Sequence, residues 1–483
     1  MEAAWAHEKA EAMTTTVTGE QDLALKNDPY VLDPAKIQEP PEGWRASLKY
    51  LGPGMVTSAA VVGSGELITA TTLGAQVGFM LLWIVLISTF VKVAVQIELA
   101  RWSISTGKVA MTGYDQVPPR IGKRGWISYI GLLMFLQILI GQAGVLGAAA
   151  LAMSMILPIG GDPMSTVSLG FWIAVMVVLA IAIHAANKYD VVEKVSTVLV
   201  VLVTLLVVAM LFGVQFTPFN WTAGDLAHGL TFQIAAGSMG VALAMFGLTG
   251  VGAGEITAYT YWCVEKGYAA WTGRNDGSQA WAARARGWVK VMQLDAWVSW
   301  VIYTVSTAAF YILGAAVLHP QGLVPKGNAV LETISHIFTD TMGGWAGVAF
   351  LIGAAVALFK TILANAPGFS RQVTNTLAVF GVFSWTDLVA RDKWMRALVI
   401  ALPIAWGLFA VVFKSPLELL IIAGIGNALF LMAVVVAVLH LNRTETDPRI
   451  KGHGAWYVYL WVSAIAVFAV GALGLWDQIQ KML

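Results

Sequence analysis

Residues 51–78, LGPGMVTSAAVVGSGELITATTLGAQVG, are apolar enough to form a membrane helix, yet they carry Gly63-Ser64-Gly65-Glu66 halfway along. Glycines weaken a helix locally, so we expect this helix to be interrupted there. A carboxylate at membrane depth is costly and by default indicates function. The same pattern returns as Gly252-Ala253-Gly254-Glu255, within a later apolar segment from about 234 to 264.

The composition is that of a polytopic membrane protein. Of the 483 residues, 58% are hydrophobic and 12% are charged, whereas a soluble domain carries about 25% charged residues. The net charge of +1 excludes a strongly basic nucleic-acid binder. The single cysteine, Cys263, excludes both an intramolecular disulfide and a cysteine-built zinc site.

Apolar runs long enough to cross a bilayer, about 20 residues each, predict an all-α membrane protein with eleven transmembrane helices. The predicted spans are 49–74, 78–104, 126–157, 165–186, 192–215, 234–264, 290–318, 344–366, 396–413, 416–441 and 455–477.

The distribution of Lys and Arg predicts the orientation. If the amino terminus is inside, the loops predicted outside hold only Lys326 and Lys414, and the other loop Lys and Arg residues face inward. The positive-inside rule then places the amino terminus in the cytoplasm and the carboxyl terminus outside, in a bacterial-type inner (plasma) membrane. Residues 1–47 lack the apolar core of a signal peptide and are expected to be a mostly disordered cytoplasmic tail.

The repeated break predicts two five-helix units of opposite orientation, an amino-acid-symporter type of fold. The expected units are 48–215 and 216–441, followed by an eleventh helix and the carboxyl terminus at 442–483. In inverted repeats the interrupted first and sixth helices meet near the bilayer midplane and form the substrate site. The alternative is that the glycines are helix-packing motifs, which explains the small residues but not a glutamate at the same offset in both.

Several framework motifs resemble the Nramp (natural resistance-associated macrophage protein) family of proton-coupled divalent-metal transporters. The resemblance runs from about 48 to 451 and implies the fold of the amino-acid symporters. It is carried by Gly52-Pro53-Gly54, Gly74-Ala75-Gln76, Gly78-Phe79, Leu81-Leu82-Trp83, Gln96, Ala100-Arg101, Thr106-Gly107, Val192-Glu193-Lys194 and Leu441-Asn442-Arg443.

The metal ligands of that family are replaced here. Its Asp-Pro-Gly-Asn break corresponds to residues 63–66, its Met-Pro-His break to Gly252-Ala253-Gly254, and its span-ten Gln falls near Asn427. Carboxylate, carbonyl and water ligands suit hard cations, so this departure from the family's ligands predicts a Mg²⁺ site first and Mn²⁺ second, with Glu66 and Glu255 as metal ligands. A hydrated Mg²⁺ is the natural candidate because Mg²⁺ dehydrates reluctantly.

The full expected substrate-binding set is Gly63, Gly65, Glu66, Thr69, Gly252, Gly254, Glu255, Thr257 and Asn427. The alternative to a binding role for the two threonines is that their hydroxyls hydrogen-bond back to their own helix.

Three charged residues are candidates for coupling or gating. Lys360 lies in the eighth span, where an unpaired ammonium is costly. It either replaces a coupling sodium ion or pairs with Glu66 or Glu255, or else it snorkels to the inner interface. Arg101 and Asp295 lie at the inner ends of the second and seventh spans, as parts of an intracellular gate or as interface anchors.

The sequence contains no nucleotide-binding signature and no nucleophile–base constellation. It therefore predicts a gradient-driven transporter rather than an enzyme, with no cofactor. The expected partners are the transported cation or small solute and the lipid bilayer, with no nucleic acid, and the expected state is a monomer. Two alternatives stay open: the same fold carrying a small organic cation or zwitterion, and a membrane receptor that binds without transporting.

Overall fold

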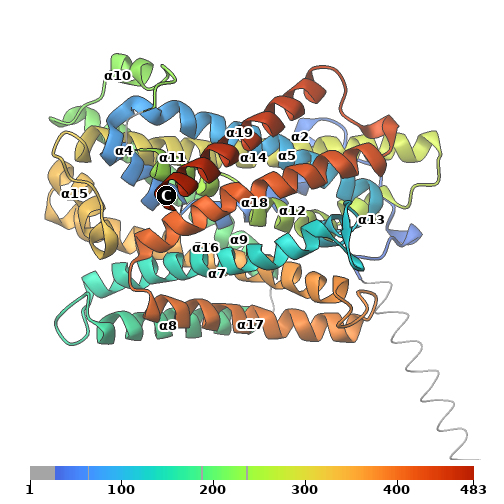
Figure 1. The fold of residues 1–483 in the computed structure, drawn as a ribbon, viewed down its shortest axis with the longest axis horizontal. Helices are drawn as coiled ribbons and strands as arrows, with labels where there is room; N and C mark the ends of the chain where they lie inside the picture. The colour runs from blue at the N-terminus through green and yellow to red at the C-terminus, as the bar shows by residue number, and fades with distance from the viewer. Residues whose placement is uncertain (1–27, 64, 186–188, 235–237, 483) are drawn as a thin grey trace, which may run out of the picture.

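The computed structural model describes residues 28–63, 65–185, 189–234 and 238–482. Its long helices run side by side along one axis, with short helices and loops at the two ends of the bundle (Figure 1). Up to residue 213 the helices are α2 (Trp44–Ser47), α3 (Pro53–Val61), α4 (Thr71–Val77), α5 (Leu82–Thr106), α6 (Ala110–Tyr114), α7 (Trp126–Ile156), α8 (Thr166–Ala185) and α9 (Tyr189–Gly213).

The later part of the chain is also helical. Its helices are α10 (Ala223–His228), α11 (Met239–Leu248), α12 (Ala253–Lys266), α13 (Tyr268–Thr272), α14 (Gln279–Leu313), α15 (Val330–Met342), α16 (Gly344–Val379), α17 (Leu388–Val412), α18 (Pro416–Thr444) and α19 (Ala455–Met482).

Shorter elements connect these helices. Two strands pair antiparallel, β1 (Arg120–Ile121) and β2 (Arg124–Gly125). Two segments are π-helical, η3 (Gly65–Ala70) and η6 (Gly314–Leu318). The 3₁₀ turns are η1 (Pro34–Lys36), η2 (Leu48–Tyr50), η4 (Gly78–Leu81), η5 (Val214–Phe216), η7 (Gly327–Ala329) and η8 (Pro448–Ile450).

Local sequence signals set several helix boundaries. The Ser278 and Asp387 side chains accept backbone N–H groups and so cap the starts of α14 and α17. Pro416 stands at the first position of α18, where its missing N–H costs nothing. Gly107, with a φ of 70°, ends α5 in the left-handed conformation that glycine adopts most easily.

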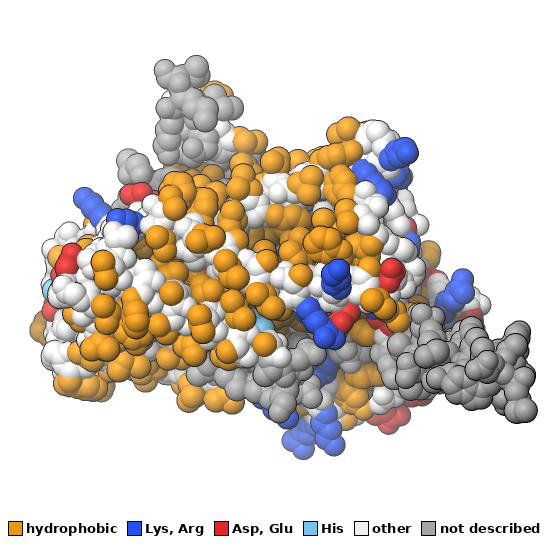
Figure 2. All heavy atoms as spheres, turned by 90° about the horizontal axis from the view of Figure 1, so that it is seen from below, with side chains coloured by type: hydrophobic (Ala, Val, Ile, Leu, Met, Phe, Trp, Pro, Cys, Tyr) orange, Lys and Arg blue, Asp and Glu red, His pale blue; other side chains and the backbone are white. Residues whose placement is uncertain are grey.

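The helical membrane class predicted from composition is confirmed. Eight helical segments in the described residues are long and apolar enough to cross a membrane. Large apolar side chains such as Leu133, Val178 and Leu408 are exposed on them, as expected of a lipid-facing surface. Figure 2 shows hydrophobic side chains over the middle of one face, with charged side chains gathered mainly toward its right-hand end.

Each predicted span coincides with helical structure, but the boundaries differ. Predicted span 344–366 falls on α16, which continues through Pro367 to Val379. Hydropathy misses this extension because its buried side chains, including Gln372 and Asn375, are polar. Predicted span 49–74 is shared by α3, η3 and α4, and predicted span 234–264 by α11 and α12.

The residues just before α3 differ from the disordered tail expected at 1–47. Asp28 forms an ion pair with Arg391 of α17 at 2.6 Å, and the Trp288 indole of α14 donates to the Gln38 carbonyl at 2.8 Å. Residues 28–47 are thus held against the bundle by specific contacts. Residues 1–27 of the predicted tail lie outside the described part of the chain.

Candidate functional site

The first break consists of the residues between α3 and η3. Val62 leaves the helical conformation with a ψ of 108°, and Gly63 has a φ of 148°, which only glycine adopts without strain. A Cβ on Gly63 would lie 2.7 Å from the Thr361 hydroxyl and 2.8 Å from the Ala357 carbonyl oxygen of α16. Gly63 is therefore needed for its backbone conformation and for its close packing on α16. Ser64 of the predicted motif lies outside the described residues.

The second break, residues 249–252, separates α11 from α12. Gly250 has a φ of 62°, and Gly252 stands just before the first residue of α12. A Cβ on Gly252 would collide with the side-chain amide of Asn427. Asn427, from α18, joins the two sides of the break: its Oδ1 accepts from the Ala253 N–H at 2.9 Å and its Nδ2 donates to the Gly247 carbonyl at 2.8 Å.

The glutamate of each motif caps the start of its own following helix. Glu255 Oε2 accepts from the Gly252 N–H at 3.2 Å, the reciprocal half of a capping box. Glu66 Oε2 accepts from the Gly63 N–H, also three residues earlier, at 3.3 Å. A carboxylate is favourable at the positive end of a helix dipole. Capping thus explains why both glutamates share one offset, which helix packing by small residues does not.

Glu66 also joins the two breaks. Its Oε1 accepts from the Gly250 N–H of the second break at 3.3 Å and from the Thr307 hydroxyl of α14 at 3.2 Å. The side chain is completely buried. Both carboxylate oxygens of Glu66 therefore already have protein donors.

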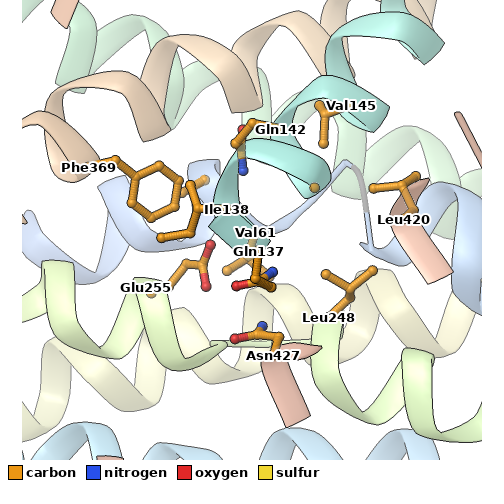
Figure 3. A pocket seen from close by; sticks show the side chains of 14 residues that line it. Val61, Gln137, Ile138, Gln142, Val145, Leu248, Glu255, Phe369, Leu420 and Asn427 are labelled. Atoms are coloured by element: carbon orange, nitrogen blue, oxygen red, sulfur yellow. The ribbon is translucent and has the colours of Figure 1, made fainter. Parts of the chain in front are cut away.

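A small cavity lies against the second break (Figure 3). Its volume of about 30 Å³ is room for about two water molecules, at about 10–15 Å³ for each water. Its polar side chains are Gln137, Gln142, Glu255 and Asn427. The remaining lining residues are Ala60, Val61, Ile138, Gly141, Val145, Leu248, Gly250, Gly254, Phe369 and Leu420.

The cavity contains an unsatisfied acceptor. Gln142 is buried, and its Oε1 has no hydrogen-bond partner in the part of the chain that the structure describes. Buried polar atoms in proteins almost always have a partner. A cation or a water molecule in the cavity would supply one.

Only some of the predicted substrate-binding residues line the cavity. Gly254, Glu255 and Asn427 line the cavity, whereas Gly63, Gly65, Glu66, Thr69, Gly252 and Thr257 are not part of its lining. Thr257 donates back to the Ala253 carbonyl at 2.7 Å and lies 2.9 Å from the Tyr114 hydroxyl. Thr69 is buried within η3.

Sequence reasoning missed Gln137 and Gln142 as lining residues, although two glutamines in the apolar span 126–157 were a usable signal. It also assigned no site role to Lys92, a fully buried lysine in the middle of α5. The Lys92 ammonium donates to the Phe246 and Thr249 carbonyls at the end of α11, the latter at 2.6 Å.

Lys360 is buried rather than snorkelling to an interface, with an exposed fraction of 1%. Its ammonium donates to the carbonyls of Ala59, at 2.8 Å, and Val62, at the end of α3. These hydrogen-bond partners are backbone oxygens rather than Glu66 or Glu255.

The two predicted gate residues lie in different environments. Asp295 of α14 accepts from the Gly52 and Gly54 N–H groups at 2.9 and 2.5 Å and from the Tyr259 hydroxyl of α12 at 2.8 Å. It therefore ties the start of α3 to α12 and α14.

Arg101 instead pairs with Glu98 on its own helix at 2.8 Å and donates to the Ile450 carbonyl at 2.7 Å. Glu98 also accepts from Asn442 of α18 and Trp456 of α19. The Arg101 cluster thus anchors α5 to α18 and α19, and among the described residues Arg101 and Asp295 share no hydrogen-bond partner.

The described residues contain no group of three or more His, Cys, Asp or Glu side chains placed to hold a metal ion. Any cation in the cavity would rely on one carboxylate, side-chain amides and backbone carbonyls. These are hard oxygen donors.

These features define a multi-pass helical membrane protein with two interrupted helical segments beside a buried polar cavity. Solved structures show the same fold. A variant of the Eremococcus coleocola manganese transporter matches with a TM-score of 0.66 and 16% identity over 91% of this chain and 88% of that chain. MhsT in complex with L-phenylalanine matches with a TM-score of 0.56 and 15% identity over 90% of this chain and 100% of that chain.

The family model described as "Natural resistance-associated macrophage protein-like" matches residues 54–477. The chain belongs to this Nramp family, as its framework motifs predicted. Two relatives named divalent metal cation transporter MntH match along most of their length. The relative from Granulibacter bethesdensis is 23% identical over 91% of this chain and 90% of its own length. The relative from Xanthomonas campestris is 26% identical over 90% of this chain and 91% of its own length.

Proposed function

We propose that this protein is a secondary transporter of a divalent metal cation, with the cargo bound in the cavity beside the second break. The observation that carries the proposal is the unsatisfied Gln142 Oε1 in a cavity shared with the Glu255 carboxylate. The names of the MntH relatives and of the Eremococcus coleocola manganese transporter support this substrate class.

We infer that the cargo is manganese or divalent metals in general, rather than the magnesium expected from the sequence, because the names of the relatives support this class. Carboxylate and amide oxygens suit both ions. However, magnesium gives up its waters reluctantly and usually keeps several, and a cavity of about 30 Å³ has room for about two waters. This volume leaves room for few of those waters, and the relatives are named as transporters of manganese or of divalent metals.

The proposed arrangement in the membrane is the one that the charge pattern predicts. Eleven spans form two inverted five-helix units, 48–215 and 216–441, plus an eleventh helix, with the amino terminus inside and the carboxyl terminus outside. In this arrangement the two breaks lie near the midplane. The cargo contacts Glu255, Gly254 and Asn427. The other predicted substrate-binding residues shape the two breaks around the cavity: Gly63, Gly65, Glu66, Thr69, Gly252 and Thr257. Asp295 holds the inner end of α3 closed.

A small organic cation or zwitterion is the second candidate. It is favoured by Phe369 and Ile138 on the cavity wall and by two buried ammoniums, on Lys92 and Lys360, that offset the two glutamates. The small cavity volume argues against it in this conformation.

Uptake into proteoliposomes tests the proposal. We expect time-dependent Mn²⁺ uptake, weaker competition by Mg²⁺, and an uptake at least about tenfold lower in Glu255→Gln, because losing a charged ligand costs about 1.4 kcal/mol or more. The matched control is Glu418→Gln, an exposed residue in the first turn of α18. Saturable binding without flux would instead indicate a receptor, and no response to any divalent cation would favour the organic solute.

A further inference from the structure

Two buried lysines make similar contacts at the two breaks. Lys360, from α16, donates to the Ala59 and Val62 carbonyls where α3 ends. Lys92, from α5, donates to three carbonyls where α11 ends, those of Phe246, Gly247 and Thr249. Each ammonium thus binds the carbonyl end of one interrupted helix.

Such helix ends require a partner. The last four carbonyls of a helix have no intrahelical donor, and together they form the negative end of the helix dipole. Here both ends are buried inside the protein, and burying such groups without partners is costly. A compact cation with donors in several directions satisfies them, and a lysine ammonium has three N–H donors and no acceptor.

The lysines also balance the charge of the site. The Lys92 ammonium interacts electrostatically with both Glu255 and Glu66, and the Lys360 ammonium with Glu66. The two breaks thus contain as many buried lysines as buried glutamates. Each break therefore has a glutamate at the start of the following helix and a lysine at the end of the preceding one.

We propose that Lys92 and Lys360 are resident cations of the transport site. Each takes the place that a bound monovalent cation would occupy on the carbonyl end of an interrupted helix. Transport of the divalent cargo consequently needs neither Na⁺ nor K⁺. The prediction that uptake needs neither Na⁺ nor K⁺ rests on the proposed transport function. Replacement of a lysine ammonium by a free cation at either helix end can be measured without cargo.

The test removes each ammonium and offers a free cation in its place. In proteoliposomes, wild-type Mn²⁺ uptake should change by less than about twofold when choline replaces Na⁺ or K⁺. Lys360→Ala and Lys92→Ala should each lose about tenfold or more in choline and regain most of it in Li⁺, Na⁺ or K⁺. Lys290→Ala, at an exposed position of α14, is the matched control and should behave as wild type.

A cargo-free measurement separates this proposal from the proposed function. Binding of a cation stabilises the folded state, so Na⁺ or K⁺ should raise the melting temperature of purified Lys360→Ala and Lys92→Ala above that of choline samples but leave wild type unchanged. Lys360→Arg, which keeps the charge, shows whether loss of folding alone explains a defect. A wild type that needs Na⁺ or K⁺, or alanine variants whose stability and uptake respond to no monovalent cation, would overturn the proposal.

Discussion

The two breaks carry the same glycine–glutamate motif but differ in what surrounds it. At the first break both Glu66 oxygens have protein donors, and Gly63 packs on the backbone of α16. At the second break Glu255 borders a cavity with an unsatisfied amide oxygen. One motif thus packs tightly against its neighbours at the first break and forms part of a cavity wall at the second.

The largest expected effect on stability comes from adding one methyl group at Gly63 of the first break. Gly63→Ala forces alanine into a φ of 148° and places its Cβ against the Ala357 carbonyl oxygen, so we expect a destabilisation of about 3 kcal/mol or more. In Gly254→Ala the new Cβ meets the Phe369 ring at 3.0 Å, and movement of the ring should limit the cost to about 1 kcal/mol. Melting temperatures in detergent test both; equal losses would remove the distinction between the breaks.

Asn427→Ala should weaken both the second break and the site. It leaves the Ala253 N–H without its partner, at about 1–3 kcal/mol for an unsatisfied group, and leaves the Gly247 carbonyl with only the 3.5 Å contact from the Lys92 ammonium. Titration should show cation affinity reduced by about tenfold.

The control for this substitution is on the same helix. Asn442→Ala removes the hydrogen bond to Glu98 and should lower the melting temperature without changing cation affinity. If both variants bind the cation equally well, Asn427 is only structural.

Asp295→Asn tests whether the inner end of α3 moves during transport. An amide cannot replace a carboxylate that accepts from Gly52, Gly54 and Tyr259, so the contact should loosen. Hydrogen exchange at the start of α3 should rise, and uptake should change while the cation Kd stays within about twofold. A changed Kd at unchanged exchange would argue against a gating role.

Much of this comparison could be predicted from the sequence. The apolar runs predicted the helical membrane class, and the glycines predicted where the chain leaves the helical conformation near Gly63 and Gly250, because these are local properties. The sequence did not show that Lys92 meets the end of α11, since that contact joins residues about 150 positions apart. The same limit hid Gln137 and Gln142: one apolar span with little periodicity does not reveal which face meets the second break.

The smallest expected effect lies away from both breaks. Asp447 pairs with Arg449 at 2.7 Å in the loop before α19, and this hydrogen-bonded ion pair holds the Asp447 pKa well below its ordinary value. The stabilisation is therefore fully present above the unfolded pKa of about 4 and is lost as the pH falls through the folded pKa. Asp447→Asn should lower stability at pH 7 by less than about 1 kcal/mol and reduce the loss of stability below pH 4. A pH series of melting temperatures checks this, and a changed cation affinity in this variant would contradict it.

In the proposed site the cargo cation contacts Glu255, whereas Glu66 holds the two breaks together through its hydrogen bonds. Isothermal titration of Mn²⁺ into purified wild type, Glu66→Gln and Glu255→Gln tests it most directly. We predict saturable binding by wild type and an affinity at least about tenfold weaker in Glu255→Gln. The affinity of Glu66→Gln should stay within about threefold of the wild-type value, and its melting temperature should fall instead. Loss of binding in Glu66→Gln together with retained binding in Glu255→Gln would contradict the account.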